Sequence, residues 1–552
     1  MKLINYINLL LLSGVMVVSS CDKTRLETQN LNQPSYGVLD NENGTYAFAK
    51  GFYKIGFGDQ SVGSLDDGLG YGMLLIVQGF HEGMGDNIFI PWGNNNFKFA
   101  DNPLWVKLDN GTKVNNPIGQ GQIFETKLRN ERAYGATNGF LPEWTYMYFL
   151  NNSCNVLLSK LSSISFSGDA ATKKKVLEAW AYWWKGYAYS RIGSMYIAGV
   201  IAETPNSTNG NFVTKEAMIT EANKNFDKAV TILTGLSSGG AFDEVMKQII
   251  PGYMQPANYG EIPSPAVWVK NINTMKARNL LVNKKVSDMT PADWSQILTL
   301  TNAGLTSPND YPFLVKTYND NTKSIFDKDF GSAGSYAATN DPTYYISERL
   351  IQDFKPGDKR KTNNFALFAS AIVNRRGRGI TFGTRYYMVD GGNGNGAYTY
   401  FDFGIGATDY FIAGSYEENM LMKAEALINT AGQRDAGLAI IDAIRNFQGA
   451  GIAAVSGTGL TDAQAREELR RERRCALFLR GLAWYDLRRL GMNISVDDGG
   501  TGRSGCVVLD ANGVVNTNCQ INYAYLTYWD VPQNELDFNA PASTSAPVTS
   551  PR

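Results

Sequence analysis

The segment 460–491, LTDAQAREELRRERRCALFLRGLAWYDLRRLG, is the longest well-patterned helical stretch in the sequence. Thr461 followed three residues later by Gln464 is a capping box, in which the two residues satisfy each other's backbone at a helix start. Gly491 supplies a stop, because glycine tolerates the left-handed conformation that ends helices. Between these ends one stripe stays apolar at helical spacing, through Leu469, Ala476, Leu477, Trp484, Leu487 and Leu490. The pattern predicts one long helix in a largely helical protein.

The charge of this segment is unusual for the chain. It carries eight arginines against five carboxylates, whereas the whole sequence has 51 Lys and Arg against 52 Asp and Glu. Such a run is typical of a solvated helix face or of internal ion pairs rather than of a ligand surface. The balanced total also gives no overall field to attract nucleic acid, so we expect no nucleic-acid partner.

Histidine content and short motifs narrow the function further. His81 is the only histidine among the 552 residues, which argues against a histidine-dependent triad hydrolase or a multi-histidine metal site. Gly392, Gly394 and Ala397 fit the GxGxxA pattern, but the strand-like sequence AYTYFDF follows where a dinucleotide site needs a helix. We therefore predict a hairpin at this point, and we expect no cofactor, no metal and no catalytic residue.

The first 21 residues have the layout of an export signal. Lys2 precedes an apolar run over 7–18, which is too short for a typical membrane span, and small residues then lead to Cys21. This layout resembles a bacterial lipoprotein signal, with cleavage before Cys21 and lipid on that residue; an ordinary signal peptide is the alternative. We predict three parts: a lipoprotein signal peptide over 1–20, a lipidated cysteine with a flexible tether over 21–45, and a single folded domain over 46–552.

The remaining cysteines predict one disulfide, which export would permit. Cys506 and Cys519 lie at equal distances from Asn512-Gly513, the preferred pair for a two-residue hairpin turn. In that register they oppose each other at a non-hydrogen-bonded position, where the α-carbons approach most closely. We predict a disulfide between them. Cys154 and Cys475 fall in helical patterns and are expected to be buried thiols.

Helical patterning covers much of the remaining chain. Apolar stripes at helical spacing predict buried helix faces, over 141–161, 172–192, 215–233, 267–282 and 291–305. Segment 415–449 predicts two helices joined at Gly432, the first opened by a capping box at Ser415 and Glu418. Two helices in about 34 residues match a tetratricopeptide unit, and several stacked units would form a helical solenoid.

The candidate ligand site lies in the irregular segments. Trp92, Asn94 and Asn96 share a loop in which an aromatic ring can stack on a sugar while amides bond its hydroxyls. Long irregular connections in compact proteins tend to be functional, and those over 306–345 and 375–411 add four aromatic candidates: Tyr311, Tyr318, Tyr398 and Tyr400. A packing role is the alternative for each of these side chains.

Several segments together resemble the SusD/RagB family of outer-membrane nutrient-binding lipoproteins. The most specific is ELRRERRCALFLRGLAWYDLRRLG, which is similar to the family signature at Glu468, Arg471, Glu472, Arg473, Gly481, Trp484, Tyr485, Asp486, Leu487 and Arg488. The segments YEENMLMKAEALINTAG, AIIDAIRNFQGAG and WDVPQNELDFN resemble further family patterns. Lys185-Gly186 and the stretch AGVIAETP depart from the family pattern and indicate a divergent member.

The resemblance implies a mainly α fold, with tetratricopeptide-like helix pairs as scaffold, long irregular loops and small β-hairpins. It implies a lipid anchor in the outer membrane, a position facing the cell exterior, and a SusC-like TonB-dependent transporter as partner. The ligands would be glycans or, in some lines, oligopeptides, bound without catalysis. Position in the family pattern makes Trp92, Asn94 and Asn96 the first candidates for the ligand site. The arginine-rich segment would belong to the scaffold, so Arg473→Ala or Asp486→Ala should cost stability rather than ligand affinity.

Two other functions remain open. An exported glycoside hydrolase needs two carboxylates flanking a cleft, one of them with a raised pKa, and no sequence feature marks such a pair. The other is a purely structural lid for the transporter, without ligand affinity.

Overall fold

The computed structural model of the chain describes residues 39–53, 55–57, 72–91, 97–252, 255–257, 259–316, 344–402, 404 and 406–551. The expected signal peptide, Cys21 and most of the expected tether lie outside these ranges. The described chain already packs at Leu39, which is 1% exposed, and its first helix starts after Asn41. The folded part therefore begins a few residues before the predicted boundary at 46. In the described ranges, no helix is both long and apolar enough to cross a membrane.

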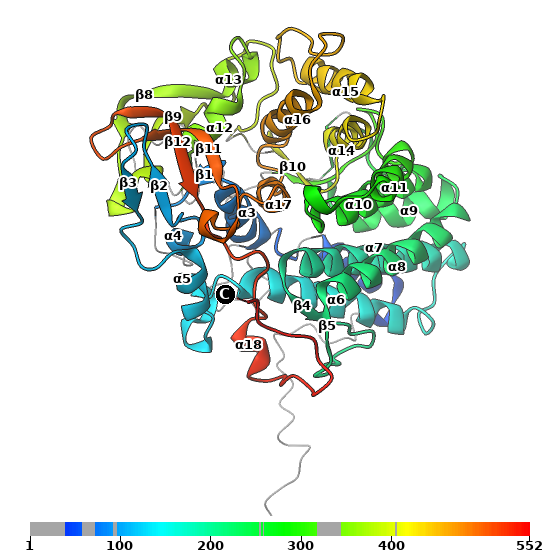
Figure 1. The fold of residues 1–552 in the computed structure, drawn as a ribbon. Coiled ribbons are helices and arrows are strands. Elements are labelled where there is room, and N and C mark those ends of the chain that lie inside the picture. Colours follow the sequence, from blue (N-terminus) through cyan, green and yellow to red (C-terminus); the bar gives the residue numbers. More distant parts are fainter. Residues whose placement is uncertain are drawn as a thin grey trace, which may run out of the picture.

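Helices build most of the described structure (Figure 1). In chain order the α-helices are α2 (Glu42–Phe52), α3 (Gln78–Met84), α4 (Phe97–Ala100), α5 (Gln122–Leu128), α6 (Leu141–Lys160), α7 (Ala170–Met195), α8 (Lys215–Thr234), α9 (Gly240–Ile249), α10 (Pro265–Val282), α11 (Pro291–Asn302), α12 (Glu348–Asp353), α13 (Lys359–Asn364), α14 (Tyr416–Ile428), α15 (Arg434–Phe447), α16 (Asp462–Ala476), α17 (Ala483–Arg489) and α18 (Gln533–Leu536). A π-helical turn, η3 (Gly72–Val77), leads into α3, and short 3-10 turns are η5 (Arg132–Thr137), η7 (Val286–Asp288), η9 (Arg375–Gly377), η10 (Ile380–Phe382) and η11 (Val496–Asp498).

The long helices pack in the order in which they follow the chain. Contacts link α6 to α7, α7 to α8, α8 to α10, α10 to α11, α11 to α14, and α14 to both α15 and α16. In Figure 1 this array runs from the lower right of the molecule to its top. Each predicted helix over 141–305 and both helices of 415–449 are present, shifted by a few residues at their ends. The mainly α prediction with stacked helix pairs is confirmed.

The centre of the array is the aromatic face of α7. Trp180, Trp183 and Trp184 have no exposed surface, and each indole contributes a large apolar area to the core. Trp180 Nε1 donates to the Ala49 carbonyl at 2.9 Å and Trp183 Nε1 donates to Asn271 Oδ1 at 3.0 Å. These bonds satisfy two of the buried N–H groups, so the stripe packs tightly against α2 and α10. One hydrophobic cluster runs on through the described chain from α2 to the C-terminal segment.

The segment 460–491 forms two helices rather than the predicted one. The capping box at Thr461 and Gln464 is present and opens α16. The chain then breaks before α17, where Leu479 has a φ of 61° and Gly481 a φ of 68°. The Gly481 N–H donates to Glu82 Oε1 of α3 at 2.9 Å, and the Gln78 side chain donates to the Leu479 carbonyl. A tertiary contact with α3 therefore supplies partners that a continuing helix would have supplied locally.

Strands are short and form small antiparallel sheets. Four of these are two-stranded: β1 (Ile88–Phe89) with β7 (Tyr345–Ile346), β6 (Phe313–Lys316) with β10 (Asp409–Ala413), β4 (Ala198–Val200) with β5 (Phe212–Thr214), and β8 (Phe365–Ile372) with β9 (Thr384–Met388). The fifth has the order β11 (Arg503–Leu509), β12 (Val515–Asn522), β2 (Trp105–Lys107), β3 (Lys113–Asn115) and stands at the left of Figure 1. No strand forms over 397–402, so the hairpin predicted from AYTYFDF is wrong.

The β11–β12 hairpin places Cys506 opposite Cys519, as predicted, but with a different turn and a bulge that were not predicted. The turn is longer than predicted, because Asp510 Oδ1 accepts from the N–H groups of Asn512 and Val514 and Leu509 pairs with Val515. A bulge between Cys506 and Val508 then restores the register. Both cysteines are free thiols in the structure, so the predicted disulfide is not formed there. Cys154 and Cys475 are buried thiols, as predicted.

Candidate functional site

The first-choice ligand residues lie outside the described part of the chain. Trp92, Asn94 and Asn96 fall within 92–96, and Tyr318 falls within 317–343. The structure does describe the residues at which both segments leave and re-enter the fold. The geometry of these ends defines where the two candidate loops start.

A two-residue sheet brings the two loops to one place. In β1·β7, Ile88 pairs with Ile346 and Phe89 with Tyr345. The loop of Trp92 follows β1, and the segment containing Tyr318 ends immediately before β7. The two strands are antiparallel, so the start of one loop lies beside the end of the other. Phe89 and Tyr345, more than 200 positions apart in the sequence, therefore lie side by side next to the two candidate segments.

The closing end of the first loop is tied to its opening end. Asp101, just after α4, accepts a hydrogen bond from the Ile90 N–H at 2.8 Å through Oδ2. Burial raises the pKa of Asp101 well above its usual range, although the Ile90 bond and Arg378 act against the shift. The Phe97 ring packs at a tilt against Phe80, with centroids 4.7 Å apart, and edge-on against Tyr344, with centroids 6.0 Å apart. The loop thus opens and closes on a rigid, buried base.

The long segment 317–343 is anchored equally well at its start. β6, which leads into it, pairs with β10. The Leu314 N–H donates to Tyr53 Oη at 3.0 Å, and the Tyr53 hydroxyl donates back to the Leu314 carbonyl. Lys316 Nζ and Asp409 Oδ1 lie 3.8 Å apart at the end of the β6·β10 pairing. Both candidate loops therefore have ordered ends.

The other predicted aromatic residues belong to the core or its edge. Tyr311 is only 2% exposed and packs edge-on against Phe313, so its ring is not available as a platform for a sugar. Tyr400 is 4% exposed and donates to the Cys475 carbonyl at 2.7 Å. Tyr398 is half-buried. For Tyr311 and Tyr400 the packing alternative is the correct one.

A partly exposed cluster beside β10 was missed by the sequence analysis. The Arg480 guanidinium stacks on Phe411 at 3.5 Å from the ring centroid and donates to Tyr398 Oη at 3.1 Å. Glu417 lies 3.3 Å from the same guanidinium. Arg480 lies at the break between α16 and α17. The sequence predicted one continuous helix there, which gave no reason to expect Arg480 beside β10. An aromatic ring next to a guanidinium is a surface that sugars and peptides both suit.

Under the first loop lies a buried ionic network. Asp86 accepts bonds from Arg349 at 2.8 to 3.1 Å, from Ser347 at 2.9 Å and from Tyr523 at 2.5 Å. Burial alone would raise the pKa of Asp86, but the guanidinium of Arg349, with two further arginines, holds it at about 2. Arg474 of α16 donates to the carbonyls of Gly85 and Asp86, at 2.8 Å each. The arginine-rich helix therefore holds the backbone just before β1.

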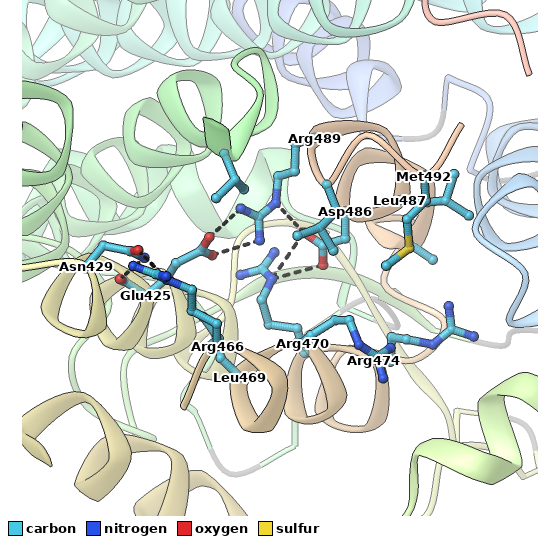
Figure 2. Close-up of a pocket in the computed structure, with 14 residues that line it drawn as sticks. Glu425, Asn429, Arg466, Leu469, Arg470, Arg474, Asp486, Leu487, Arg489 and Met492 are labelled. Carbon is cyan, nitrogen blue, oxygen red and sulfur yellow. Dashed lines mark hydrogen bonds and ion pairs between the residues drawn. The ribbon is translucent and has the colours of Figure 1, made fainter. Parts of the chain in front are cut away.

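A cleft between α14, α16 and α17 is lined by five arginines: Arg466, Arg470, Arg473, Arg474 and Arg489 (Figure 2). Arg489 lies between Glu425 and Asp486, bonding the first at 2.5 and 2.7 Å and the second at 2.7 Å. Arg473 Nε donates to Asp486 at 2.9 and 3.1 Å. Since the carboxylates already pair with these guanidiniums, the cleft is part of the scaffold, as the sequence analysis expected.

The single histidine is also part of this interior. His81 has no exposed surface, and its Nε2 lies 3.3 Å from Glu143 Oε2. Burial lowers its pKa despite the nearby carboxylate. Across the described ranges, no group of three or more His, Cys, Asp or Glu side chains is placed to hold a metal ion.

Comparison with known proteins agrees with this architecture. Residues 416–544 match the SusD family. No curated protein sequence matches the chain. Solved structures match almost all of it, at identities that show a shared fold alone.

Three of these structures illustrate the likeness. A SusD-like carbohydrate binding protein from Bacteroides fragilis NCTC 9343 has a TM-score of 0.56 at 13% identity, covering 91% of this chain and 98% of its own. One from Bacteroides vulgatus ATCC 8482 has a TM-score of 0.53 at 12% identity, covering 92% and 99%. A third, solved with a xylogluco-oligosaccharide, has a TM-score of 0.55 at 13% identity, covering 92% and 99%. The part of the chain that holds α14–α18 therefore matches the SusD family, and the chain shares the fold of SusD-like proteins.

Proposed function

We propose that the protein is a cell-surface lipoprotein that captures glycans, without changing a covalent bond, and delivers them to a SusC-like TonB-dependent transporter in the outer membrane. The observation that supports the ligand part is the pairing of β1 with β7, because the segment of Trp92 follows β1 and the segment of Tyr318 ends just before β7. The carbohydrate-binding SusD-like proteins with the same fold support a glycan as the ligand class. We propose a signal peptide over 1–20, lipid on Cys21 and one ligand-binding domain over 46–552.

Within this site we assign the sugar platform to Trp92, with Asn94 and Asn96 as hydrogen-bonding groups and Tyr318 from the second loop. A stacked ring and a few amide bonds support affinities of roughly micromolar to millimolar strength. Oligopeptides are the second ligand class, because aromatic rings and amides bind extended peptides too.

Isothermal titration of the mature protein against neutral and acidic oligosaccharides and a peptide mixture tests the ligand class. Trp92→Ala should lose affinity at least tenfold with an unchanged melting temperature. The matched control is Phe447→Ala, which removes an aromatic ring that is 45% exposed on α15. Equal affinity in parent and Trp92→Ala would remove Trp92 from the site, and a panel without any binding would favour the lid without ligand.

Three further measurements test the lipid anchor, the absence of catalysis and the transporter partnership. Cys21→Ser should prevent incorporation of labelled lipid and release the protein from the outer membrane. Incubation with polysaccharides should give no new reducing ends; their appearance would establish the hydrolase alternative. Co-purification of the tagged protein with a TonB-dependent barrel from detergent extracts tests the transporter partnership.

A further inference from the structure

The cleft of Figure 2 has a row of arginines along one face of α16. Arg466, Arg470 and Arg473 all line it. Arg473 follows Arg466 by seven residues, which is almost two helical turns and returns the side chain to the same face. Arg474 and Arg489 of α17 complete the set. The residues that line this cleft belong to the described part of the chain and lie outside the two candidate ligand loops.

The ion pairs around the cleft contain more guanidiniums than carboxylates. Asp353 is shared by three arginines, Glu467 by two and Asp486 by two. Glu425 pairs with one of the arginines that also hold Asp486. Four carboxylates therefore serve six guanidiniums: Arg470, Arg471, Arg473, Arg474, Arg489 and Arg503.

Arg466 adds a cation whose partner is neutral. Its Nε donates to Asn429 Oδ1 at 2.9 Å, so an amide takes the place that a carboxylate could occupy. Arg466 is exposed and lines the cleft, which makes the cleft accessible from solvent.

Arg473 has a buried donor that the described chain leaves unused. Its side chain is 3% exposed, and its Nε donates to Asp486 at 2.9 and 3.1 Å. Its Nη1 is buried and has no hydrogen-bond partner within the described residues. An unsatisfied buried donor destabilises a fold. Because Arg473 lines the cleft, an acceptor bound there would supply the missing partner.

One run of contacts along the cleft wall joins these two arginines. Asn429, the acceptor for Arg466, ends α14 and donates through its amide to the Glu425 carbonyl at 2.9 Å. Glu425 and Asp486 hold Arg489 between them (Figure 2). Asp486 continues the wall to the unused donor described above. The protein therefore fixes the wall of the cleft through its own side chains.

We propose that the cleft between α14, α16 and α17 binds a doubly charged tetrahedral oxyanion, phosphate or sulfate, which accepts hydrogen bonds from Arg473 Nη1 and from Arg466. Guanidiniums bind such oxyanions through several N–H groups at once. A dianion offsets more of the excess positive charge than a carboxylate would. The bound anion stabilises the contact of α16 with α14 and α17. This site goes beyond the proposed function, because it uses neither the ligand loops nor a glycan.

Isothermal titration of the mature protein with sodium phosphate, sodium sulfate and sodium acetate tests the site. The buffer is free of phosphate, and sodium chloride holds the ionic strength constant. We expect one saturable site per chain for phosphate or sulfate, of roughly micromolar to millimolar strength, and at least tenfold weaker binding of acetate. Saturation separates this site from the general stabilisation of folded proteins by phosphate and sulfate, which are excluded from the protein surface.

Variants then locate the binding. Arg466→Gln should weaken it about threefold to tenfold and leave the fold intact, because this side chain is exposed and bonds an amide. The matched control is Arg471→Gln on the same helix, since Arg471 is 35% exposed, pairs with Glu467 and lies outside the cleft lining. Arg473→Lys keeps a cation near Asp486 but removes Nη1, and it should weaken binding at least tenfold. Circular dichroism shows whether each variant folds, and Arg466→Gln decides the question if Arg473→Lys does not.

The results that would overturn the site are distinct. No saturable binding of phosphate or sulfate, or equal affinities in Arg466→Gln and Arg471→Gln, would remove the cleft as an anion site. Acetate bound as tightly as the two dianions would overturn the assignment of a doubly charged ligand. None of these measurements depends on glycan binding, so their outcome does not depend on the proposed function.

Discussion

Replacing Asp486 by alanine tests whether the arginine-rich segment is scaffold. Asp486 is the only carboxylate that the described structure pairs with Arg473, and it also accepts from Arg489. The Arg473 side chain is 3% exposed and that of Asp486 is 11% exposed. After the substitution Arg489 keeps Glu425, whereas Arg473 becomes a buried cation without a counter-ion.

The expected loss follows from that unpaired cation. Removing one partner of a buried ion pair costs about 3–5 kcal/mol, mainly because the other charge stays buried. The matched control is Asp462→Ala on α16, the helix that also carries Arg473; the partner of Asp462, Arg434, is 39% exposed and Asp462 itself is 62% exposed. Such a surface pair contributes about 0–1 kcal/mol, and an acidic residue in the first helical turn adds up to about 1 kcal/mol. Asp486→Ala should therefore cost at least about 1 kcal/mol more than Asp462→Ala.

Urea unfolding followed by tryptophan fluorescence measures this difference at pH 7. Burial would raise the pKa of Asp486, but Arg473 and Arg489 lower it below its usual value. Its stabilising effect is therefore present above the ordinary Asp pKa of about 3.9 and disappears as the pH falls through the lower folded value. Ligand affinity of the folded variant should stay within about twofold of the parent. Equal stabilities for the Asp486 and Asp462 variants, or a loss of affinity with Asp486→Ala, would refute the scaffold assignment.

Two further predictions concern buried titratable groups. Burial raises the pKa of Glu82 from 4.5 to about 7, so the stability of the fold should fall as the pH rises from about 4.5 to about 7. Glu82→Gln should abolish this fall, because Asn87 Oδ1, which has no partner among the described residues, can accept from the new amide. Urea titrations of both proteins at pH 5 and pH 8 would measure the difference. Cys506 and Cys519 oppose each other in β11 and β12, so the exported, unreduced protein should lack these two thiols in an assay after unfolding, and a protein with all four thiols beyond Cys21 free would contradict the disulfide.

The scaffold was predictable because its signals are local. Apolar stripes and N-cap side chains lie within a few residues of the helices they specify, as at Thr461 and Ser415. The break after α16 was not predictable in this way, because LFLRG continues the apolar spacing. Its cause is Glu82, about 400 residues away in the sequence, which accepts the Gly481 N–H. The prediction of a two-residue turn in the β11–β12 hairpin was wrong for a local reason. Asp510 Oδ1 accepts from the N–H groups of Asn512 and Val514, and these bonds override the preference for a two-residue turn at Asn512-Gly513.

The candidate site was predictable only as separate pieces. A strand of two residues has no alternation to detect, so β1 and β7 gave no signal in the sequence. Their pairing is the step that joins the loop of Trp92 to the segment of Tyr318. Tyr311 was misassigned because composition does not distinguish a loop ring that faces solvent from one that packs on Phe313.

The arginine-rich helix α16 contacts the backbone just before β1 through Arg474. Arg474 donates to the carbonyls of Gly85 and Asp86, which precede β1 and the loop of Trp92, whereas its neighbour Arg473 pairs within the scaffold. Arg474→Gln and Arg473→Gln should both lower stability, since each removes a buried cation from its partners. Only Arg474→Gln should also weaken glycan binding, because it frees the backbone that sets the start of the loop. Titrations well below the melting temperature of both variants measure this difference. Equal affinities for the two variants would mean that β1 and β7 alone position the loop, and that the signature helix supports the fold without affecting the ligand site.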